Sequence, residues 1–113
     1  MSTRIHEVAF QGWFATAPKV RRGRAFRPRS IAAETRVLAA LYAAEGGVRP
    51  ASAIATAADV RAGTVAYLIC RLRSAMDAEA IDTVPGVGYR LTEVGLAECR
   101  AALASFGEEV RAA

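Results

Sequence analysis

The chain is organised around residues 63–76, which read Gly63-Thr64-Val65-Ala66-Tyr67-Leu68-Ile69-Cys70-Arg71-Leu72-Arg73-Ser74-Ala75-Met76. Written as an α-helix, this segment gathers its large apolar residues into one stripe at helical spacing: Val65, Leu68, Ile69, Leu72 and Met76. The opposite side carries Thr64, Tyr67, Arg71 and Ser74, with Cys70 and Arg73 on its flanks. We therefore expect a helix that is anchored along one side and presents hydroxyl and guanidinium groups along the other.

A β-hairpin is predicted directly after this helix. Residues 80–92 contain two short β-type runs on either side of Pro85-Gly86. An amphipathic helix followed at once by a hairpin is typical of the recognition helix and wing of winged helix-turn-helix proteins. The predicted fold class is mainly α with a small β-hairpin (α+β): a winged helix-turn-helix with a three-helix core, a wing and a C-terminal helix.

Two helices are predicted upstream of the central one. Ser30 is a suitable N-cap for a helix over about residues 31–44, and Gly46-Gly47 ends it. Pro50 suits the first turn of a second, short helix rich in alanine. Residues 59–62 then make a tight connection into the central helix, in helix-turn-helix order. Without the hairpin, the same pattern would fit a generic three-helix bundle.

A last helix is predicted after the wing, with Thr92 as its N-cap and residues 93–110 as its body. Its apolar residues recur at spacings of three and four: Leu96, Cys99, Leu103, Phe106 and Val110. Gly95 and Gly107 weaken it somewhat. The stripe either folds back on the same domain or pairs with a second copy. We expect a homodimer through Leu96, Cys99, Leu103 and Phe106.

The positive charge is concentrated near the N-terminus. The chain has a net charge of +4, but residues 1–29 carry seven basic groups against Glu7, and residues 30–113 carry eight basic against ten acidic groups. Residues 19–29 form a basic, turn-rich segment of the kind that lies along a narrow minor groove or serves as a solvated tail. It partly resembles an AT-hook, although Ala25-Phe26 interrupts the motif. Its arginines are Arg21, Arg22, Arg24, Arg27 and Arg29.

Residues 1–17 are predicted to form either one short strand or a loop whose aromatic side chains cover the core. Gly12 and Pro18 argue against a long helix. Trp13 and Phe14 fit packing better than base stacking. The predicted organisation is an N-terminal arm over residues 1–29, a winged helix-turn-helix domain over 30–92 and a C-terminal helix over 93–113.

Several classes of protein are disfavoured. Cys70 and Cys99 form no CxxC pair and His6 is the single histidine, so we expect neither a metal site nor a nucleophile paired with histidine. Gly86-Val87-Gly88 lies in a hairpin and is therefore no phosphate-binding loop. We expect no enzyme activity and no cofactor. Without a signal peptide or an apolar run of about 18 residues, we expect a cytoplasmic, nucleoid-associated protein.

The residues around the central helix and the hairpin resemble a known family. Thr64-Val65, Ile69-Cys70-Arg71-Leu72-Arg73 and the segment 81–91 resemble the effector domain of OmpR/PhoB-type response regulators, which reads "TVDVHIxRLRxKL" and then "IxTVRGxGYRL". The match spans about residues 34–92. Segment 89–95 also resembles the "LTxxG" strand-to-helix junction of other winged-helix regulators.

This resemblance implies that the central helix reads the major groove and that the wing contacts the backbone or minor groove. Thr64, Arg71 and Arg73 match positions that face DNA in the family, and Thr83 matches a phosphate-contacting position. The family's wing arginine is Pro85 here, its other helix arginine is Cys70 and its histidine is Leu68. We expect no receiver domain and no complete N-terminal four-stranded sheet.

The predicted function is sequence-specific binding of double-stranded DNA by a bacterial-type transcriptional regulator. A winged-helix module that binds another regulator or RNA polymerase is the alternative, which the mildly acidic residues 30–113 keep open. The DNA-contacting residues are predicted on the central helix, the wing and the arm: Thr64, Tyr67, Arg71, Arg73, Ser74, Thr83, Arg90, Arg21, Arg22, Arg24, Arg27 and Arg29.

Overall fold

The computed structural model describes residues 3–16 and 28–112. This part of the chain is mostly helical, with a small two-stranded antiparallel sheet. Its elements follow in the order α1 (Thr3–Thr16), α3 (Pro28–Ala43), α4 (Ala51–Ala58), the 3₁₀ turn η1 (Ala62–Thr64), α5 (Val65–Ala75), β1 (Ile81–Val84), β2 (Gly88–Leu91) and α6 (Glu93–Ala112). The predicted α+β class is therefore confirmed at this level.

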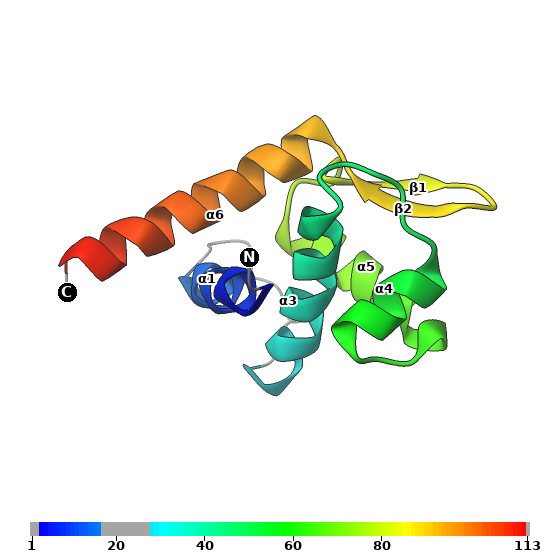
Figure 1. Cartoon of the computed structure of the whole chain (residues 1–113), viewed down its shortest axis with the longest axis horizontal. Helices are drawn as coiled ribbons and strands as arrows, with labels where there is room; N and C mark the ends of the chain where they lie inside the picture. Colours follow the sequence, from blue (N-terminus) through cyan, green and yellow to red (C-terminus); the bar gives the residue numbers. More distant parts are fainter. Residues whose placement is uncertain (1–2, 17–27, 113) are drawn as a thin grey trace.

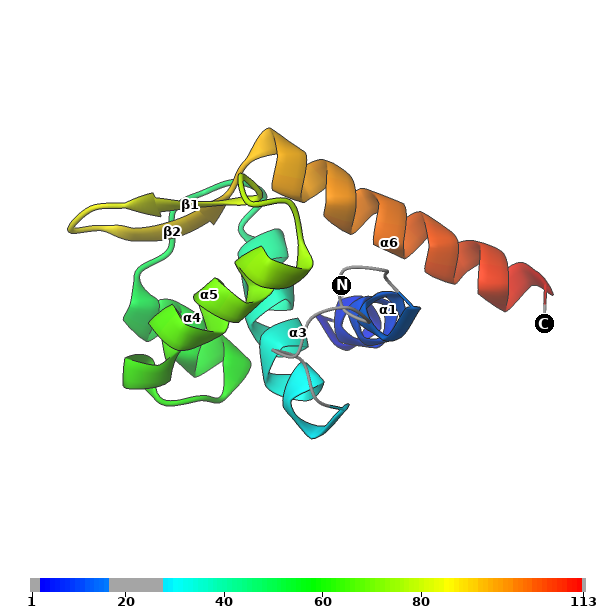
Figure 2. The ribbon, with the colours of Figure 1, turned by 180° about the vertical axis from the view of Figure 1, so that it is seen from behind.

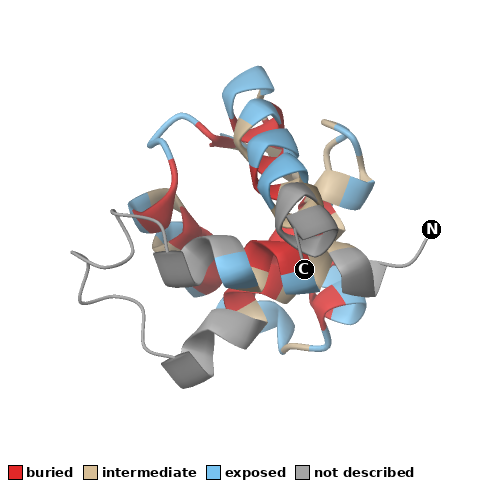
Figure 3. Cartoon of the chain, turned by 90° about the vertical axis from the view of Figure 1, so that its left-hand side faces the viewer, coloured by how far each residue is buried: buried red, intermediate tan, exposed pale blue. Residues whose placement is uncertain are grey.

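Helix α3 lies at the centre of the molecule, with α1 on one side and the α4–α5 pair on the other (Figure 1). The β1–β2 hairpin projects from one end of the molecule, and α6 leaves the hairpin in the opposite direction and passes over α1 (Figures 1 and 2). The outward side of α6 is exposed, whereas buried residues gather where the helices face one another (Figure 3). The hairpin is thus held at its base and exposed at its tip.

The apolar stripe predicted for the central helix forms the middle of the core. Val65, Leu68, Ile69 and Leu72 are all buried on α5, and Met76 is buried just after it. They pack in one cluster with apolar residues of α1, α3, α4 and α6, among them Phe10, Leu38, Leu41, Ile54, Leu96 and Cys99. Burial of this stripe fixes which side of α5 faces outward, because the remaining residues are turned away from the core.

Helix α1 was not predicted, and the expectation of a strand or loop over residues 1–17 is wrong. The side chain of Phe10 is fully buried, and its ring meets that of Tyr42 edge to face, with centroids 5.9 Å apart. His6 lies one turn earlier and also meets Tyr42 edge to face, at 5.0 Å. These contacts outweigh the roughly 1 kcal/mol cost of a glycine such as Gly12 inside a helix. Residues 3–16 of the predicted arm therefore pack on the body of the molecule.

The other helix boundaries differ slightly from the prediction. Helix α3 begins at Pro28, so Ser30 lies inside its first turn and is not its N-cap. The helix ends before the predicted glycines, where Gly46 adopts a φ of 91°. Pro50 is the N-cap of α4, and Asp59 caps its C-terminus in the left-handed conformation, with a φ of 55°. A 3₁₀ turn at 62–64 precedes α5.

The predicted hairpin is confirmed, and one further backbone segment joins it. Ile81 pairs with Leu91 at its base and Val84 with Gly88 near its tip. On the other side of β2, Arg49 and Tyr89 exchange two backbone hydrogen bonds of 2.9 Å each. A Cβ on Gly88 would collide with the Arg49 carbonyl oxygen, so only glycine allows this close approach. The segment before α4 thus fixes the position of the hairpin.

Helix α6 folds back on its own domain. Thr92 precedes it as predicted, and its Oγ1 accepts a hydrogen bond of 3.2 Å from the amide of Gly95. Leu96 and Cys99 are buried in the core, and Leu103 packs partly against it. Two of the four residues expected at a homodimer contact, Leu96 and Cys99, are therefore already covered within the chain. Phe106 is half-buried, and the side chain of Val110 lies outside the described residues.

No single helix among the described residues is long and apolar enough to cross a membrane. The pair α4 plus η1–α5 has the length and composition for it, but a bend of 106° separates its halves.

Candidate nucleic-acid interface

Helices α4 and α5 form a sharply bent pair joined by residues 59–64. The bend is 106°. Inside the connection, the amide of Val60 donates to the carbonyl of Ala55, and Thr64 donates through both its amide and its hydroxyl to the carbonyl of Arg61. These bonds satisfy backbone groups at the end of α4 and the start of α5. The turn is thereby held in one conformation.

The outward side of α5 is exposed. Tyr67 is 60% exposed, and Thr64, Cys70 and Ser74 are exposed as well. The Ser74 hydroxyl donates to the Cys70 carbonyl within the same helix. Three of the predicted contact residues, Thr64, Tyr67 and Ser74, are thus on the surface side, as the sequence pattern indicated.

Arg71 is turned toward α3 instead. Its side chain is only 12% exposed, and its Nε donates to Oε1 of Glu34 at 3.2 Å. Its Nη1 also donates to the Tyr67 hydroxyl at 3.1 Å, and the guanidinium lies 5.6 Å from the centre of the Tyr67 ring. The prediction that Arg71 faces outward is therefore wrong, because this side chain is committed to an internal carboxylate.

Glu34 is a charged residue in the core. Its side chain is 1% exposed, and its Oε2 has no hydrogen-bond partner among the described residues. Burial raises the pKa of the Glu34 carboxyl, and the charge and hydrogen bond of Arg71 oppose that rise. Glu34 was not predicted as important, although its position four residues before Leu38 and seven before Leu41 places it on the apolar side of the helix.

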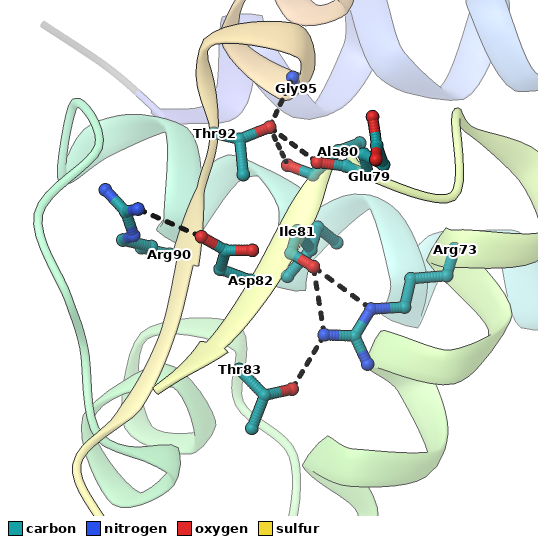
Figure 4. Close-up of polar contacts among 9 residues, drawn as sticks. All are labelled: Arg73, Glu79, Ala80, Ile81, Asp82, Thr83, Arg90, Thr92 and Gly95. Carbon is teal, nitrogen blue, oxygen red and sulfur yellow. Dashed lines mark hydrogen bonds and ion pairs between the residues drawn. The ribbon is translucent and has the colours of Figure 1, made fainter. Parts of the chain in front are cut away.

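Arg73 connects α5 to the hairpin (Figure 4). Its Nε and Nη2 donate to the carbonyl of Ile81 at 3.1 and 2.9 Å, and Nη2 also donates to Thr83 Oγ1 at 2.7 Å. Two predicted contact residues, Arg73 and Thr83, instead bond to each other and fix the hairpin relative to α5.

Arg90 lies across the hairpin from Asp82 and pairs with it at 2.9 Å (Figure 4). The two side chains are 43% and 49% exposed. Such exposed pairs contribute little to stability, roughly 0–1 kcal/mol, and are easily rearranged. Arg90 is thus still accessible to an external anion, whereas Arg71 is not.

Two exposed arginines near this surface were missed. Arg61 precedes η1, and Arg49 lies beside the hairpin. Both come from connecting segments whose sequence indicates only turns. The predicted contact residues Arg21, Arg22, Arg24 and Arg27 lie outside the described residues, as does the side chain of Arg29.

The described residues contain no group of three or more histidine, cysteine or acidic side chains that could hold a metal ion. The two cysteines lie in different environments: Cys70 is exposed on α5, and Cys99 is buried on α6. Burial, with a smaller contribution from Glu98, raises the pKa of the Cys99 thiol to about 12.

We expect the two thiols to react with an aromatic disulfide reagent at very different rates. Cys70 reacts in the folded protein, whereas Cys99 reacts only when the fold opens, because the attacking species is the thiolate. Absorbance kinetics with and without urea measure this, and Cys70→Ser assigns the fast phase. Fast reaction of both thiols in the native protein would contradict the placement of Cys99 in the core.

Comparison with protein-family models, with curated proteins and with solved structures found no match to this chain.

Proposed function

We propose that the protein binds double-stranded DNA as a winged helix-turn-helix, with α5 in the major groove and the β1–β2 hairpin on the backbone. The observation that carries the proposal is the exposed side of α5, which presents Thr64, Tyr67 and Ser74 next to a hairpin fixed by Arg73. The 106° bend between α4 and α5 falls in the range of about 90–120° typical of helix-turn-helix motifs.

The contacts in this proposal differ from those expected from sequence. Hydroxyl groups of Thr64, Tyr67 and Ser74 are suited to hydrogen bonds with phosphates or base edges. Exposed Arg49 and Arg61, with Arg90 at the hairpin, supply positive charge for phosphates, and we include the predicted arm at 19–29 in that role. Arg71 and Arg73 act by holding α5 and the hairpin in position.

The proposed biological role is a bacterial-type transcriptional regulator acting in the cytoplasm on nucleoid DNA, as the resemblance to OmpR/PhoB-type effector domains implies. A homodimer through the outer half of α6, at Leu103 and Phe106, is part of this proposal. Two copies would bring two α5 helices to one duplex and raise the affinity of a domain this small.

Ser74→Glu tests the proposed surface without disturbing the core. A carboxylate at this exposed position would face the phosphates, so we expect duplex affinity to fall by roughly ten-fold or more. Fluorescence anisotropy with random-sequence duplex DNA across a salt series measures the change. Ser105→Glu is a matched control, because Ser105 is also an exposed helical serine but lies on α6. Since Ser105 lies between Leu103 and Phe106, sedimentation velocity must show that this variant keeps the oligomeric state of the wild type.

Equal loss of affinity in both serine variants would mean that only net charge matters and that α5 has no special role. No binding of the wild-type chain to duplex DNA at low salt would reject the proposal. Thermal unfolding of both variants checks that the substitutions leave the fold intact.

A protein-interaction module is the second candidate, and two observations favour it. Tyr67 and Val87 are 60% and 56% exposed, which places large apolar surface on α5 and on the hairpin tip. Three of the predicted cationic contacts, Arg71, Arg73 and Arg90, have partners within the chain. In this case the partner would be another regulator or RNA polymerase, and DNA binding would be weak and independent of Ser74.

A further inference from the structure

A pocket of about 290 Å³ lies between α1, α3 and α4, apart from the exposed side of α5. Its walls are mostly alanine side chains from α3 and α4, among them Ala40, Ala53 and Ala57. Because an alanine projects only a methyl group, two helices lined with alanine leave the space between them unfilled.

The polar groups of the pocket are unbalanced in charge. Arg36 and Arg49 contribute two guanidinium groups, and Glu7 of α1 contributes one carboxylate. Arg36 uses its Nε to donate to the Ala58 carbonyl at 2.7 Å, and its other N–H groups bond to no residue that the structure describes. Within the described part of the chain, Glu7 forms no ion pair with either arginine. The pocket therefore has an excess of positive charge and free donors.

We propose that this pocket binds a small organic monocarboxylate with a short apolar body. The carboxylate would accept hydrogen bonds from Arg36 and Arg49, since a guanidinium presents paired N–H groups in the geometry that a carboxylate matches. The apolar body would lie against the alanine methyl groups and displace water from them. Glu7 at the same pocket disfavours a second negative charge on the ligand, which argues for one carboxylate and against a polyanion.

Both arginines are also connected to neighbouring elements. The backbone of Arg49 exchanges hydrogen bonds with Tyr89 of β2, and Arg36 bonds to the last residue of α4. A ligand that orders the two guanidinium groups would therefore change the environment of backbone groups in the hairpin and in the α4–α5 turn. The backbone amide of Tyr89 is the natural reporter of this effect.

The test is a titration of the ¹⁵N-labelled full-length chain with hexanoate, followed by amide chemical shifts, with hexanamide as the neutral analogue. We expect saturable shifts at Ala40, Ala53, Ala57 and Tyr89 with hexanoate, and roughly ten-fold weaker binding of hexanamide. Arg49→Gln should weaken hexanoate binding by a similar factor, because Arg49 is exposed and its side chain supports no other described contact. Arg100→Gln, an exposed arginine on α6 outside the pocket, is the matched control and should bind as wild type.

Three results would each overturn the proposal: no saturable shift at these residues, equal affinity for hexanoate and hexanamide, or unchanged affinity in Arg49→Gln. Ala53→Leu, which fills the pocket from its α4 wall, gives an independent check and should abolish the shifts. The titration contains no DNA, so its outcome is separate from that of the proposed DNA binding.

Discussion

Arg71→Ala is expected to destabilise the protein by about 3–5 kcal/mol at neutral pH, although Arg71 lies on the helix proposed to read DNA. Its guanidinium is the single described partner of Glu34 Oε1, and the other carboxylate oxygen is already buried without one. Removing Arg71 would leave an ionised carboxylate in the core with no compensating charge. Urea unfolding at constant ionic strength, followed by circular dichroism, measures the loss.

The pH dependence of this loss identifies its cause. Burial raises the folded-state pKa of Glu34, so its contribution to stability is complete below the unfolded pKa and is lost as pH rises through the folded pKa. Arg71 lowers the folded-state pKa of Glu34. In Arg71→Ala this pKa is therefore higher, and the variant continues to lose stability up to a higher pH than the wild type does. We expect the stability difference between wild type and variant to widen from mildly acidic to neutral pH.

Two controls separate charge burial from loss of packing. Glu34→Gln combined with Arg71→Ala should be more stable at neutral pH than Arg71→Ala alone, because the buried group is then neutral. Arg90→Ala breaks the half-exposed pair with Asp82 and should cost at most about 1 kcal/mol. If Arg71→Ala cost no more than Arg90→Ala, the Glu34–Arg71 pair would not have the structural role assigned to it.

The sequence predicted those parts of the fold in which local pattern and burial agree. The stripe on α5 and the Pro-Gly turn of the hairpin each appear within a few residues of sequence, and both were predicted correctly. Helix α1 was missed because its support is non-local: Phe10 is held by Tyr42, 32 positions later. The bridge between Arg49 and Tyr89 was missed for the same reason, since a single pair of backbone bonds has no local pattern.

The exposed side of α5 was predicted in position, but the contacts of its arginines were not. Thr64, Tyr67 and Ser74 follow from helical geometry alone, because they lie opposite the buried stripe. Arg71 lies three residues after Leu68, at the border of the buried side, where a long side chain can turn either way. The ion pair with Glu34 on α3 sets the direction of the Arg71 side chain. No sequence pattern on α5 indicates this ion pair. The sequence therefore predicted which side of α5 is exposed, but not which of its arginines have partners within the chain.

Gly95→Ala and Gly107→Ala are expected to change stability in opposite directions, although both glycines lie in α6. Gly95 is buried where the helix leaves the hairpin, and a Cβ there would collide with the Ala80 carbonyl and approach Leu91 Cδ2 at 2.9 Å. The Ala80 oxygen cannot move freely, because it accepts hydrogen bonds from the amide and hydroxyl of Thr92. We therefore expect Gly95→Ala to destabilise the protein by about 1–3 kcal/mol.

Gly107 has no heavy atom within 4 Å of a Cβ added to it. Alanine is the better helix former by about 1 kcal/mol, so Gly107→Ala should raise the melting temperature by a few degrees. Thermal unfolding of both variants against wild type measures the difference. From sequence alone, both glycines are weak points of one helix, and similar effects in both variants would support that interpretation. Opposite signs would show that Gly95 is required by the close contact between α6 and the base of the hairpin, the junction that sets the direction in which α6 leaves the domain.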